Sequence, residues 1–319
     1  MLGLVLDRMP PSSPERDVDF QGFAERLRRS PPGTTVTSAG KRALRAFGVA
    51  TAAVRPLPDF LIIGSKRGGT TSVHAYLQGH PAVLSLFPSA QKIKGTYFFD
   101  ENWYRGERWY RSHFPTSASR SIARRRLGVT PRSGEASPYY LFHPLAAERA
   151  ASLFPSARIV VLLRDPVERA YSHYKERRAN DTEALSFAEA IDAEEWRIAG
   201  EEERIISEPG YISIPHRHQT YLAQGRYATP IRRWMTAFPH GQVLVRPAEA
   251  LYQDTQSTYD AICDHLGLPH HRLVDPHVHE AHPSDALGAV MRRRLRAMVA
   301  DDIAQLEAYL GTSMGWPAT

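Results

Sequence analysis

The sequence predicts an α/β fold in three layers, in which helices flank a mainly parallel central sheet and a P-loop-like turn lies at one end. Two apolar runs, residues 60–63 and 159–163, are each followed at once by a helix-like stretch. Such continuous runs are typical of strands covered on both faces. The chain has 319 residues, 42% of them hydrophobic, which is enough for one large domain with a substantial core.

The first apolar run leads into a glycine-rich turn, Gly64–Thr71, which opens a helix. A turn of this kind leaves unpaired backbone N–H groups at the positive end of the helix dipole, where an anion is favoured. Lys66 and Arg67 are cations, Gly68 and Gly69 let the backbone approach closely, and residues 70–72 add hydroxyl donors. We predict a phosphate or sulfate site lined by Lys66, Arg67, Gly68, Gly69, Thr70, Thr71 and Ser72.

The turn matches the nucleoside-triphosphate loop only in part. Gly64 and Gly69 satisfy G-x-x-x-x-G, but Thr70 and Thr71 stand where a lysine and a hydroxyl residue would reach the phosphates and magnesium. The basic residues instead precede the second glycine, which suits a shorter phosphate-like group held without a metal. Taken alone, the loop could also be an ordinary strand-to-helix turn.

The second apolar run, 159–163, ends at Arg164, and a second helix begins directly after it. Asp165 with Glu168 three residues later is a capping-box pattern, and a proline stands at the first helical position. Arg164 and Ser172 are then placed to bind a second anion at the carboxyl edge of the sheet, where open α/β folds bind ligands. The alternative is that Arg164 only pairs with a carboxylate.

These two motifs resemble the sulfotransferases that use 3′-phosphoadenosine 5′-phosphosulfate (PAPS). Gly64–Ser72 resembles their 5′-phosphosulfate loop, and 159–174, with Arg164 and Ser172, resembles their 3′-phosphate segment. The resemblance spans roughly residues 58 to 319 and is of the heparan-sulfate-type and bacterial carbohydrate or small-molecule branch. Further matching stretches are 97–100, 134–140, 225–227, 242–246 and 266–269.

The resemblance implies transfer of a sulfuryl group from PAPS to a hydroxyl, or as a second choice an amine, of a carbohydrate-containing or other small-molecule acceptor. The product nucleotide would be PAP, no metal would be needed, and the class would be EC 2.8.2. Arg67 stands where the family usually has its catalytic lysine, while this chain has lysine one residue earlier, at Lys66. Both are expected to contact the 5′-phosphosulfate. Tyr227 is a further expected nucleotide contact, with aromatic packing as its alternative.

The general base is missing from the position that the resemblance indicates. Relatives often carry a glutamate three residues before the Phe-Phe pair, where this chain has Gly95, and some place a lysine at the position of Ala136. Asp100 and Glu135 are the carboxylates near the matching motifs that we rank first and second as catalytic bases. The alternative is that Asp100 caps a turn and Glu135 orders a loop.

Charge and cysteine content limit the expected partners and location. The net charge of +6 favours attraction of a polyanionic nucleotide or an acidic acceptor, and without an arginine–aromatic repeat or finger-type spacing we do not expect nucleic acid. The single cysteine, Cys263, permits no disulfide framework. With no stretch of about 20 apolar residues, we expect a cytoplasmic, bacterial protein without an integral membrane segment. The oligomeric state stays open.

The chain divides in sequence into a partly ordered N-terminal extension, 1–57, and a sulfotransferase domain, 58–319. Residues 120–132 are expected to form a solvated basic loop, and 192–203 an exposed acidic helix face. An amphipathic helix over 295–310 is predicted to close the domain. The arginines at its start are expected to be solvated: Arg292, Arg293, Arg294 and Arg296.

Two other functions stay open on sequence grounds. A P-loop nucleotide kinase shares the sheet and the loop, but it needs a Walker lysine and a magnesium-binding carboxylate that the sequence does not show. A non-catalytic PAP- or PAPS-binding protein is favoured by Gly95 and Ala136, since relatives carry functional side chains at these positions.

Overall fold

The computed structural model describes residues 38–274 and 287–317, except for the side chain of Ala90. The chain divides into two compact units, residues 1–43 and 44–319. The first helix, α2 (Ser38–Ala50), crosses this division. Most of the N-terminal extension predicted for residues 1–57 lies outside the described residues. From residue 44 onward the chain packs within the second unit, where Arg45 donates a hydrogen bond of 2.9 Å to the Ser112 hydroxyl.

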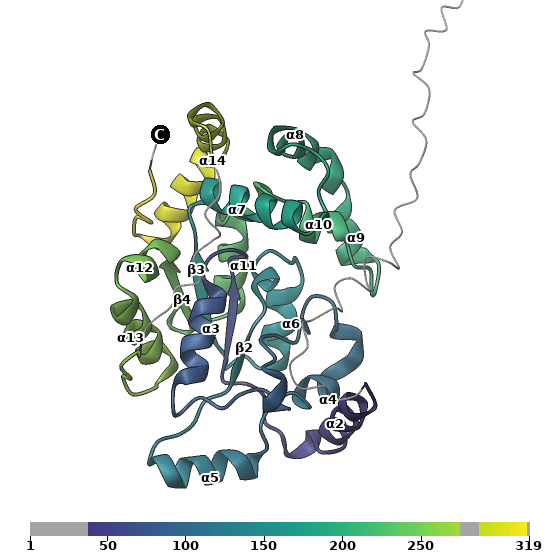
Figure 1. Cartoon of the computed structure of the whole chain (residues 1–319), viewed down its shortest axis with the longest axis vertical. Helices are drawn as coiled ribbons and strands as arrows, with labels where there is room; N and C mark the ends of the chain where they lie inside the picture. The colour runs from purple at the N-terminus through teal and green to yellow at the C-terminus, as the bar shows by residue number, and fades with distance from the viewer. Residues whose placement is uncertain (1–37, 275–286, 318–319) are drawn as a thin grey trace, which may run out of the picture. The chain divides into compact units, whose positions relative to one another are not determined.

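Four parallel strands form the central sheet, in the order β2-β1-β3-β4 (Figure 1). They are β1 (Phe60–Gly64), β2 (Gly134–Ala136), β3 (Arg158–Leu163) and β4 (Val243–Pro247). β1 is buried along its whole length, and β3 everywhere except at Arg158. The fold class predicted from the two apolar runs is therefore confirmed, and these runs are the two central strands.

Helices cover both faces of the sheet, as the burial of both side-chain rows of β1 and β3 requires. The helices that follow α2 are α3 (Thr70–Gly79), α4 (Gly106–Arg111), α5 (Ser117–Leu127), α6 (Ala146–Leu153), α7 (Pro166–Ala179), α8 (Phe187–Ile198), α9 (Glu201–Ser207), α10 (Ile214–His218), α11 (Ala228–Ala237), α12 (Ala248–Gln253), α13 (Thr255–Leu266) and α14 (Ala289–Leu310). In the described part of the chain, no helix combines the length and apolarity needed to cross a bilayer.

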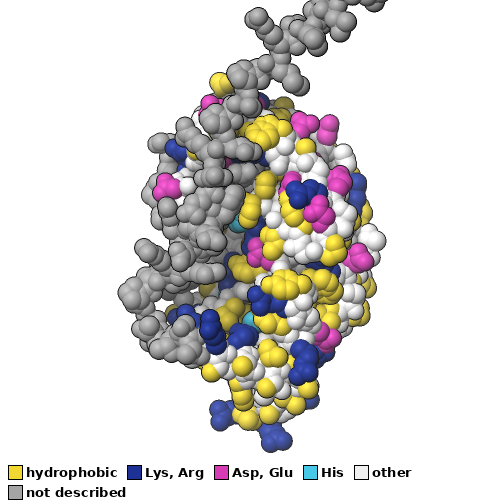
Figure 2. Space-filling view, turned by 90° about the vertical axis from the view of Figure 1, so that its right-hand side faces the viewer, with side chains coloured by type: hydrophobic (Ala, Val, Ile, Leu, Met, Phe, Trp, Pro, Cys, Tyr) yellow, Lys and Arg dark blue, Asp and Glu magenta, His cyan; other side chains and the backbone are white. Residues whose placement is uncertain are grey.

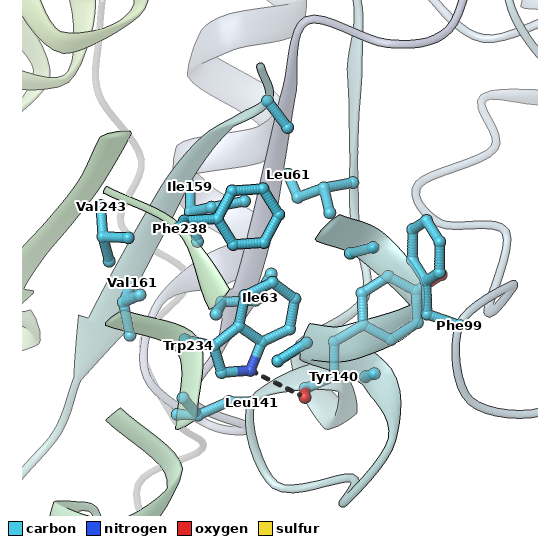
Figure 3. Close-up of a cluster of buried hydrophobic side chains, with 14 of the residues drawn as sticks. Leu61, Ile63, Phe99, Tyr140, Leu141, Ile159, Val161, Trp234, Phe238 and Val243 are labelled. Carbon is cyan, nitrogen blue, oxygen red and sulfur yellow. Dashed lines mark hydrogen bonds between the residues drawn. The ribbon is translucent and has the colours of Figure 1, made fainter. Parts of the chain in front are cut away.

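Alternate residues of the central strands belong to two separate hydrophobic clusters, one on each face. Leu61 and Ile63 pack with Trp234 and Phe238 from the end of α11 (Figure 3). The Trp234 indole donates a hydrogen bond of 3.3 Å to the backbone carbonyl of Tyr140, drawn as a dashed line. This pairing satisfies the one polar atom of a fully buried indole.

The other face of the sheet packs against α3, α12 and α13. Phe60 and Ile62 meet Val73 of α3 and Cys263 of α13 in this second cluster. Cys263 is fully buried, as a small apolar side chain would be. A third cluster joins α7, α8 and α14, and it fixes the position of α7 at the carboxyl edge of the sheet.

The prediction of a solvated basic loop at 120–132 is wrong about the loop and right about the solvation, since α5 contains no buried residue. Most of the segment belongs to α5, and Arg120 donates a hydrogen bond of 2.7 Å to the carboxylate of Asp59. Lys and Arg side chains nonetheless remain at the lower tip of the molecule in Figure 2, the height at which Figure 1 places α5. The sequence did not predict a helix here because its many serines and arginines leave too few apolar residues to show a helical spacing.

The predicted exposure of two other charged segments is wrong in part. Trp196 is 70% exposed, as expected, but Glu194 is buried and accepts hydrogen bonds from three consecutive backbone N–H groups, beginning at Tyr221. α14 closes the domain as predicted, yet Arg296 is only 4% exposed because it pairs with Asp165. Sequence periodicity cannot show that a distant element needs a charged partner.

Candidate functional site

The glycine-rich turn lies between the carboxyl end of β1 and the first turn of α3. Gly69 is the N-cap of α3 with φ of 84°, a left-handed conformation that favours glycine. A Cβ atom on Gly68 would lie 2.9 Å from the carbonyl oxygen of Leu162, which is closer than side chains normally approach. No side chain of the described residues caps α3. The turn therefore offers the backbone cradle for an anion that the sequence predicts.

The two cations of this turn reach across to α7. Lys66 Nζ lies 2.9 Å from Nε2 of His173 and 4.0 Å from the carboxylate of Glu176. Arg67 Nε donates a hydrogen bond of 3.0 Å to the hydroxyl of Ser172. Burial lowers the pKa of Lys66 to about 7; Glu176 opposes this shift and Arg177 adds to it. The structure thus brings together the residues of the two predicted anion motifs.

Arg164 lies beside the same turn, at the end of β3. Its Nη1 donates a long hydrogen bond of 3.4 Å to the carbonyl oxygen of Arg67. No carboxylate of the described residues forms an ion pair with it, so the pairing alternative finds no support there. Tyr227 is fully buried, and its hydroxyl donates a hydrogen bond of 2.8 Å to the Arg164 carbonyl. Tyr227 therefore holds the backbone at Arg164 in place through this hydrogen bond.

The capping prediction for α7 is half right. The Asp165 carboxylate accepts hydrogen bonds from the N–H groups of Val167 (2.8 Å) and Glu168 (3.3 Å), as an N-cap does. The reciprocal bond of a capping box comes instead from Glu249, which accepts from the Asp165 N–H at 2.9 Å. Glu168 pairs with Arg292. A carboxylate 84 residues away replaced the local one, which no local pattern could indicate.

A third cation at the turn, Lys94, was missed by the sequence reasoning. Its Nζ donates hydrogen bonds to the hydroxyls of Thr70 (3.2 Å) and Thr71 (2.8 Å) in the first turn of α3. Burial, together with Arg67, lowers the pKa of Lys94 to about 8. The available signal was its position in a pair of lysines just before the matching 97–100 stretch.

Glu176 on α7 was also missed. One of its oxygens accepts a hydrogen bond of 3.2 Å from Arg177, which in turn contacts Nδ1 of His218 at 3.1 Å. Burial favours the neutral carboxyl, but Lys66, Arg177 and a third nearby cation outweigh it, so the pKa of Glu176 is lowered. Its spacing of four residues from Ser172 was the signal that could have found it, because such pairs share a helix face.

Asp100 lies apart from these cations. It is 7% exposed and borders a small polar cavity with Glu101, Tyr139 and residues of the α9–α10 region. One oxygen accepts a hydrogen bond of 2.6 Å from the N–H of Glu101, and the other has no partner among the described residues. Burial raises the pKa of Asp100 to about 6, against the opposing charge of Arg217. The site therefore holds a carboxyl that can titrate near neutrality.

Glu135 is fully buried at the centre of a hydroxyl network. It accepts hydrogen bonds from the N–H and hydroxyl of Thr96 and from the hydroxyls of Tyr110, Ser137 and Tyr140. Burial raises the pKa of Glu135, although the bonds from Thr96 act against this. These hydrogen bonds hold residues 96–98 against β2, which is the loop-ordering role given above as the alternative for Glu135.

Comparison with known proteins identifies the family. The family model described as a sulfotransferase domain matches residues 57–283, which is more than half of the chain. The chain belongs to this sulfotransferase family. The resemblance inferred from the two anion motifs is therefore confirmed.

The relatives of this sulfotransferase include much longer proteins. Human bifunctional heparan sulfate N-deacetylase/N-sulfotransferase 3 is 33% identical over 231 residues, covering 71% of the chain and 24% of the relative. Human bifunctional heparan sulfate N-deacetylase/N-sulfotransferase 2 is 32% identical over 216 residues, covering 66% of the chain and 22% of the relative. The chain thus spans about a quarter of their length. A solved sulfotransferase from Alicyclobacillus acidocaldarius has a TM-score of 0.60 and 27% identity, covering 81% of the chain and 97% of that protein.

Gly95 in this sulfotransferase occupies a position with no room for a side chain. A Cβ atom there would lie 2.5 Å from the carbonyl oxygen of Ala136, which is backbone and cannot move aside cheaply. The glutamate that the resemblance places at this position would therefore need a different local backbone. The described residues also hold no group of three His, Cys, Asp or Glu side chains placed for a metal ion.

Proposed function

We propose that the chain is a PAPS-dependent sulfotransferase that transfers the sulfuryl group to a hydroxyl or amine of a carbohydrate-containing or other small-molecule acceptor. The observation that carries this proposal is the group of cations at the glycine-rich turn. Lys66 and Arg67 extend from the turn to α7, Lys94 donates hydrogen bonds to the first turn of α3, and Arg164 lies beside the turn. A donor set of this kind suits a phosphosulfate at one end and a second phosphate nearby.

Each predicted residue has a place in this proposal. The turn 66–72 would hold the 5′-phosphosulfate, with backbone N–H groups and hydroxyls as donors. Arg164 and Ser172 would hold the 3′-phosphate, and Tyr227 would keep Arg164 in position through its 2.8 Å hydrogen bond. The glycine at position 68 lets the turn pack closely against the carbonyl oxygen of Leu162 at the end of β3, which holds the proposed loop beside the Arg164 segment.

The proposed chemistry is in-line transfer, in which the protein positions the partners and stabilises the charge on the departing phosphate. Arg67 stays charged and can bind two oxygens at once. Lys66, whose pKa burial lowers to about 7, can in addition give a proton to the leaving oxygen near neutral pH. In this proposal, Lys66 and Arg67 together would stabilise the leaving phosphate, a role that the resemblance assigns to a single lysine in the family.

The acceptor and the base remain predictions. The human relatives are named as N-sulfotransferases of heparan sulfate, so an amino sugar is the first acceptor to assay, with hydroxyl acceptors beside it. Of the two predicted bases, Asp100 is better supported than Glu135, because it has an oxygen without a partner among the described residues and borders a cavity. A cytoplasmic location and a bacterial source also remain predictions.

Incubation with ³⁵S-labelled PAPS tests the function. Chitosan oligosaccharides, neutral oligosaccharides and simple phenols serve as acceptors, and PAP binding is measured in parallel by calorimetry. The proposal expects PAP binding and labelled acceptor. PAP binding with no transfer across this panel would favour a non-catalytic PAP-binding protein. ATP-dependent turnover without any response to PAPS would favour a kinase.

A further inference from the structure

We propose that Glu176 is the proton acceptor in sulfuryl transfer, supplied from α7 in place of the glutamate that position 95 cannot carry. This inference rests on the proposed function and concerns the same site. It assigns the base to a residue that neither the sequence motifs nor the resemblance indicated.

The position of Glu176 follows from the register of α7. Ser172 and Glu176 are four residues apart, so they lie on one face of the helix, one turn from each other. Ser172 is hydrogen-bonded to Arg67 at 3.0 Å, and the Glu176 carboxylate lies 4.0 Å from Lys66 Nζ. The carboxylate is therefore adjacent to both cations that are expected to hold the sulfuryl end of the donor.

One oxygen of Glu176 has no hydrogen-bond donor among the described residues. Its Oε1 accepts the hydrogen bond from Arg177, whereas its Oε2 is buried without a hydrogen-bond partner among the described residues. The side chain as a whole is 28% exposed, so part of it borders solvent at the site. Buried carboxylate oxygens without a donor are costly. A hydroxyl or ammonium group of an acceptor would provide the missing donor.

The charges around Glu176 keep it ionised before the donor binds. Burial alone would raise the pKa of Glu176, but the surrounding cations outweigh burial and lower it. A bound polyanionic donor would offset these cations, so the carboxylate would become more basic as the reactive complex forms. The charged and titratable groups near it are Lys66, Arg67, Lys94, Tyr97, Arg169, His173 and Arg177, with Arg217 and His218 of α10 around Lys66.

The two carboxylates predicted from sequence are less well placed. Glu135 already accepts hydrogen bonds from four residues, so it has little capacity for a substrate proton. The charges that act on Asp100 are those of Arg217 and Arg149 rather than those of the turn. Glu176 alone among these three contacts a cation of the anion cradle.

The proposed step balances as follows. A bond forms between the acceptor oxygen or nitrogen and sulfur while the bond between sulfur and the 5′-phosphate oxygen breaks. The electron pair of the broken bond stays on PAP, where Lys66 and Arg67 stabilise it. The acceptor's proton passes to Glu176 and then to water.

Substitution of Glu176 in the full chain tests this assignment, with the acceptor found by the panel above. Glu176→Gln should lower kcat at least 100-fold and remove the acidic limb of the pH profile of kcat/KM, while PAP affinity stays equal or tightens. Glu176→Asp should recover part of the rate and keep the limb. Glu168→Gln is the matched control on the same helix, because Glu168 pairs with Arg292; its rate should stay within twofold.

Three results would overturn the assignment while leaving the proposed function intact. The first is a Glu176→Gln rate within threefold of the wild type. The second is a large rate loss in which the acidic limb persists, which a purely structural role would give. The third is loss of the limb in Asp100→Asn instead. Absence of both PAP binding and transfer in the wild-type chain would instead contradict the proposed function itself.

Discussion

Replacement of Arg164 by alanine should weaken PAP binding by about 1.5–3 kcal/mol, or about 10- to 150-fold in Kd. In the described residues its guanidinium makes one long hydrogen bond of 3.4 Å to the Arg67 carbonyl and forms no ion pair. Most of its donors are therefore free for a charge-assisted pair with phosphate. For the same reason, its removal should cost little folding stability, because a single weak bond to backbone is lost.

Calorimetric titration of PAP into the purified chain measures this effect, with thermal unfolding as the check on stability. Arg158→Ala is a matched control, because Arg158 begins the same strand that Arg164 follows and is exposed at the opposite end. Its PAP affinity should equal that of the wild type. An Arg164→Ala variant that binds PAP with unchanged affinity would refute the assignment of the second anion site to the end of β3.

Two further predictions concern the turn and the missing base. The contribution of Lys66 to PAP affinity needs the charged ammonium, so it is complete below about pH 7, the lowered pKa of Lys66, and is lost as pH rises through that value. Calorimetry from pH 6 to 9 should show that PAP affinity falls by at most about tenfold per pH unit in the wild type and that this fall is absent in Lys66→Ala. A wild-type affinity that does not change with pH would contradict this prediction. Gly95→Ala should lower the free energy of unfolding by about 1–3 kcal/mol, because its Cβ would lie 2.5 Å from the Ala136 carbonyl oxygen. Urea unfolding checks this against Gly241→Ala, where a Cβ meets no atom within 4 Å; equal stability of the two variants would disprove the steric argument.

The candidate site is assembled from charges on separate segments of the chain. The turn after β1 carries Lys66 and Arg67, the segment before Gly95 carries Lys94, and α7 carries Glu176. In the proposed mechanism, a carboxylate among three cations would let the site bind an anion and still hold an acceptor for protons. The same four side chains are coupled, so substitutions among them should not be additive.

The sequence by itself determined the central strands, the anion turn and the family. These features depend on local information: an unbroken apolar run, glycines at the point where the backbone must turn, and a proline and an aspartate at the start of α7. Each is encoded within ten residues or so, and each predicts its structure through backbone sterics and burial. The sequence therefore predicts Arg67 and Ser172 as site residues, and the structure joins them by a hydrogen bond of 3.0 Å.

Only the tertiary structure decided which charges meet. Lys94 reaches the hydroxyls of α3, Glu249 replaces Glu168 in capping α7, and Arg296 is buried against Asp165. Each of these contacts joins residues more than twenty positions apart, and Coulomb energy depends on separation in space rather than in sequence. The same holds for Glu176, whose charged neighbours come from the turn after β1, from Lys94 and from α7 itself. It also holds for Gly95, where the closeness of the Ala136 backbone leaves no space for a side chain.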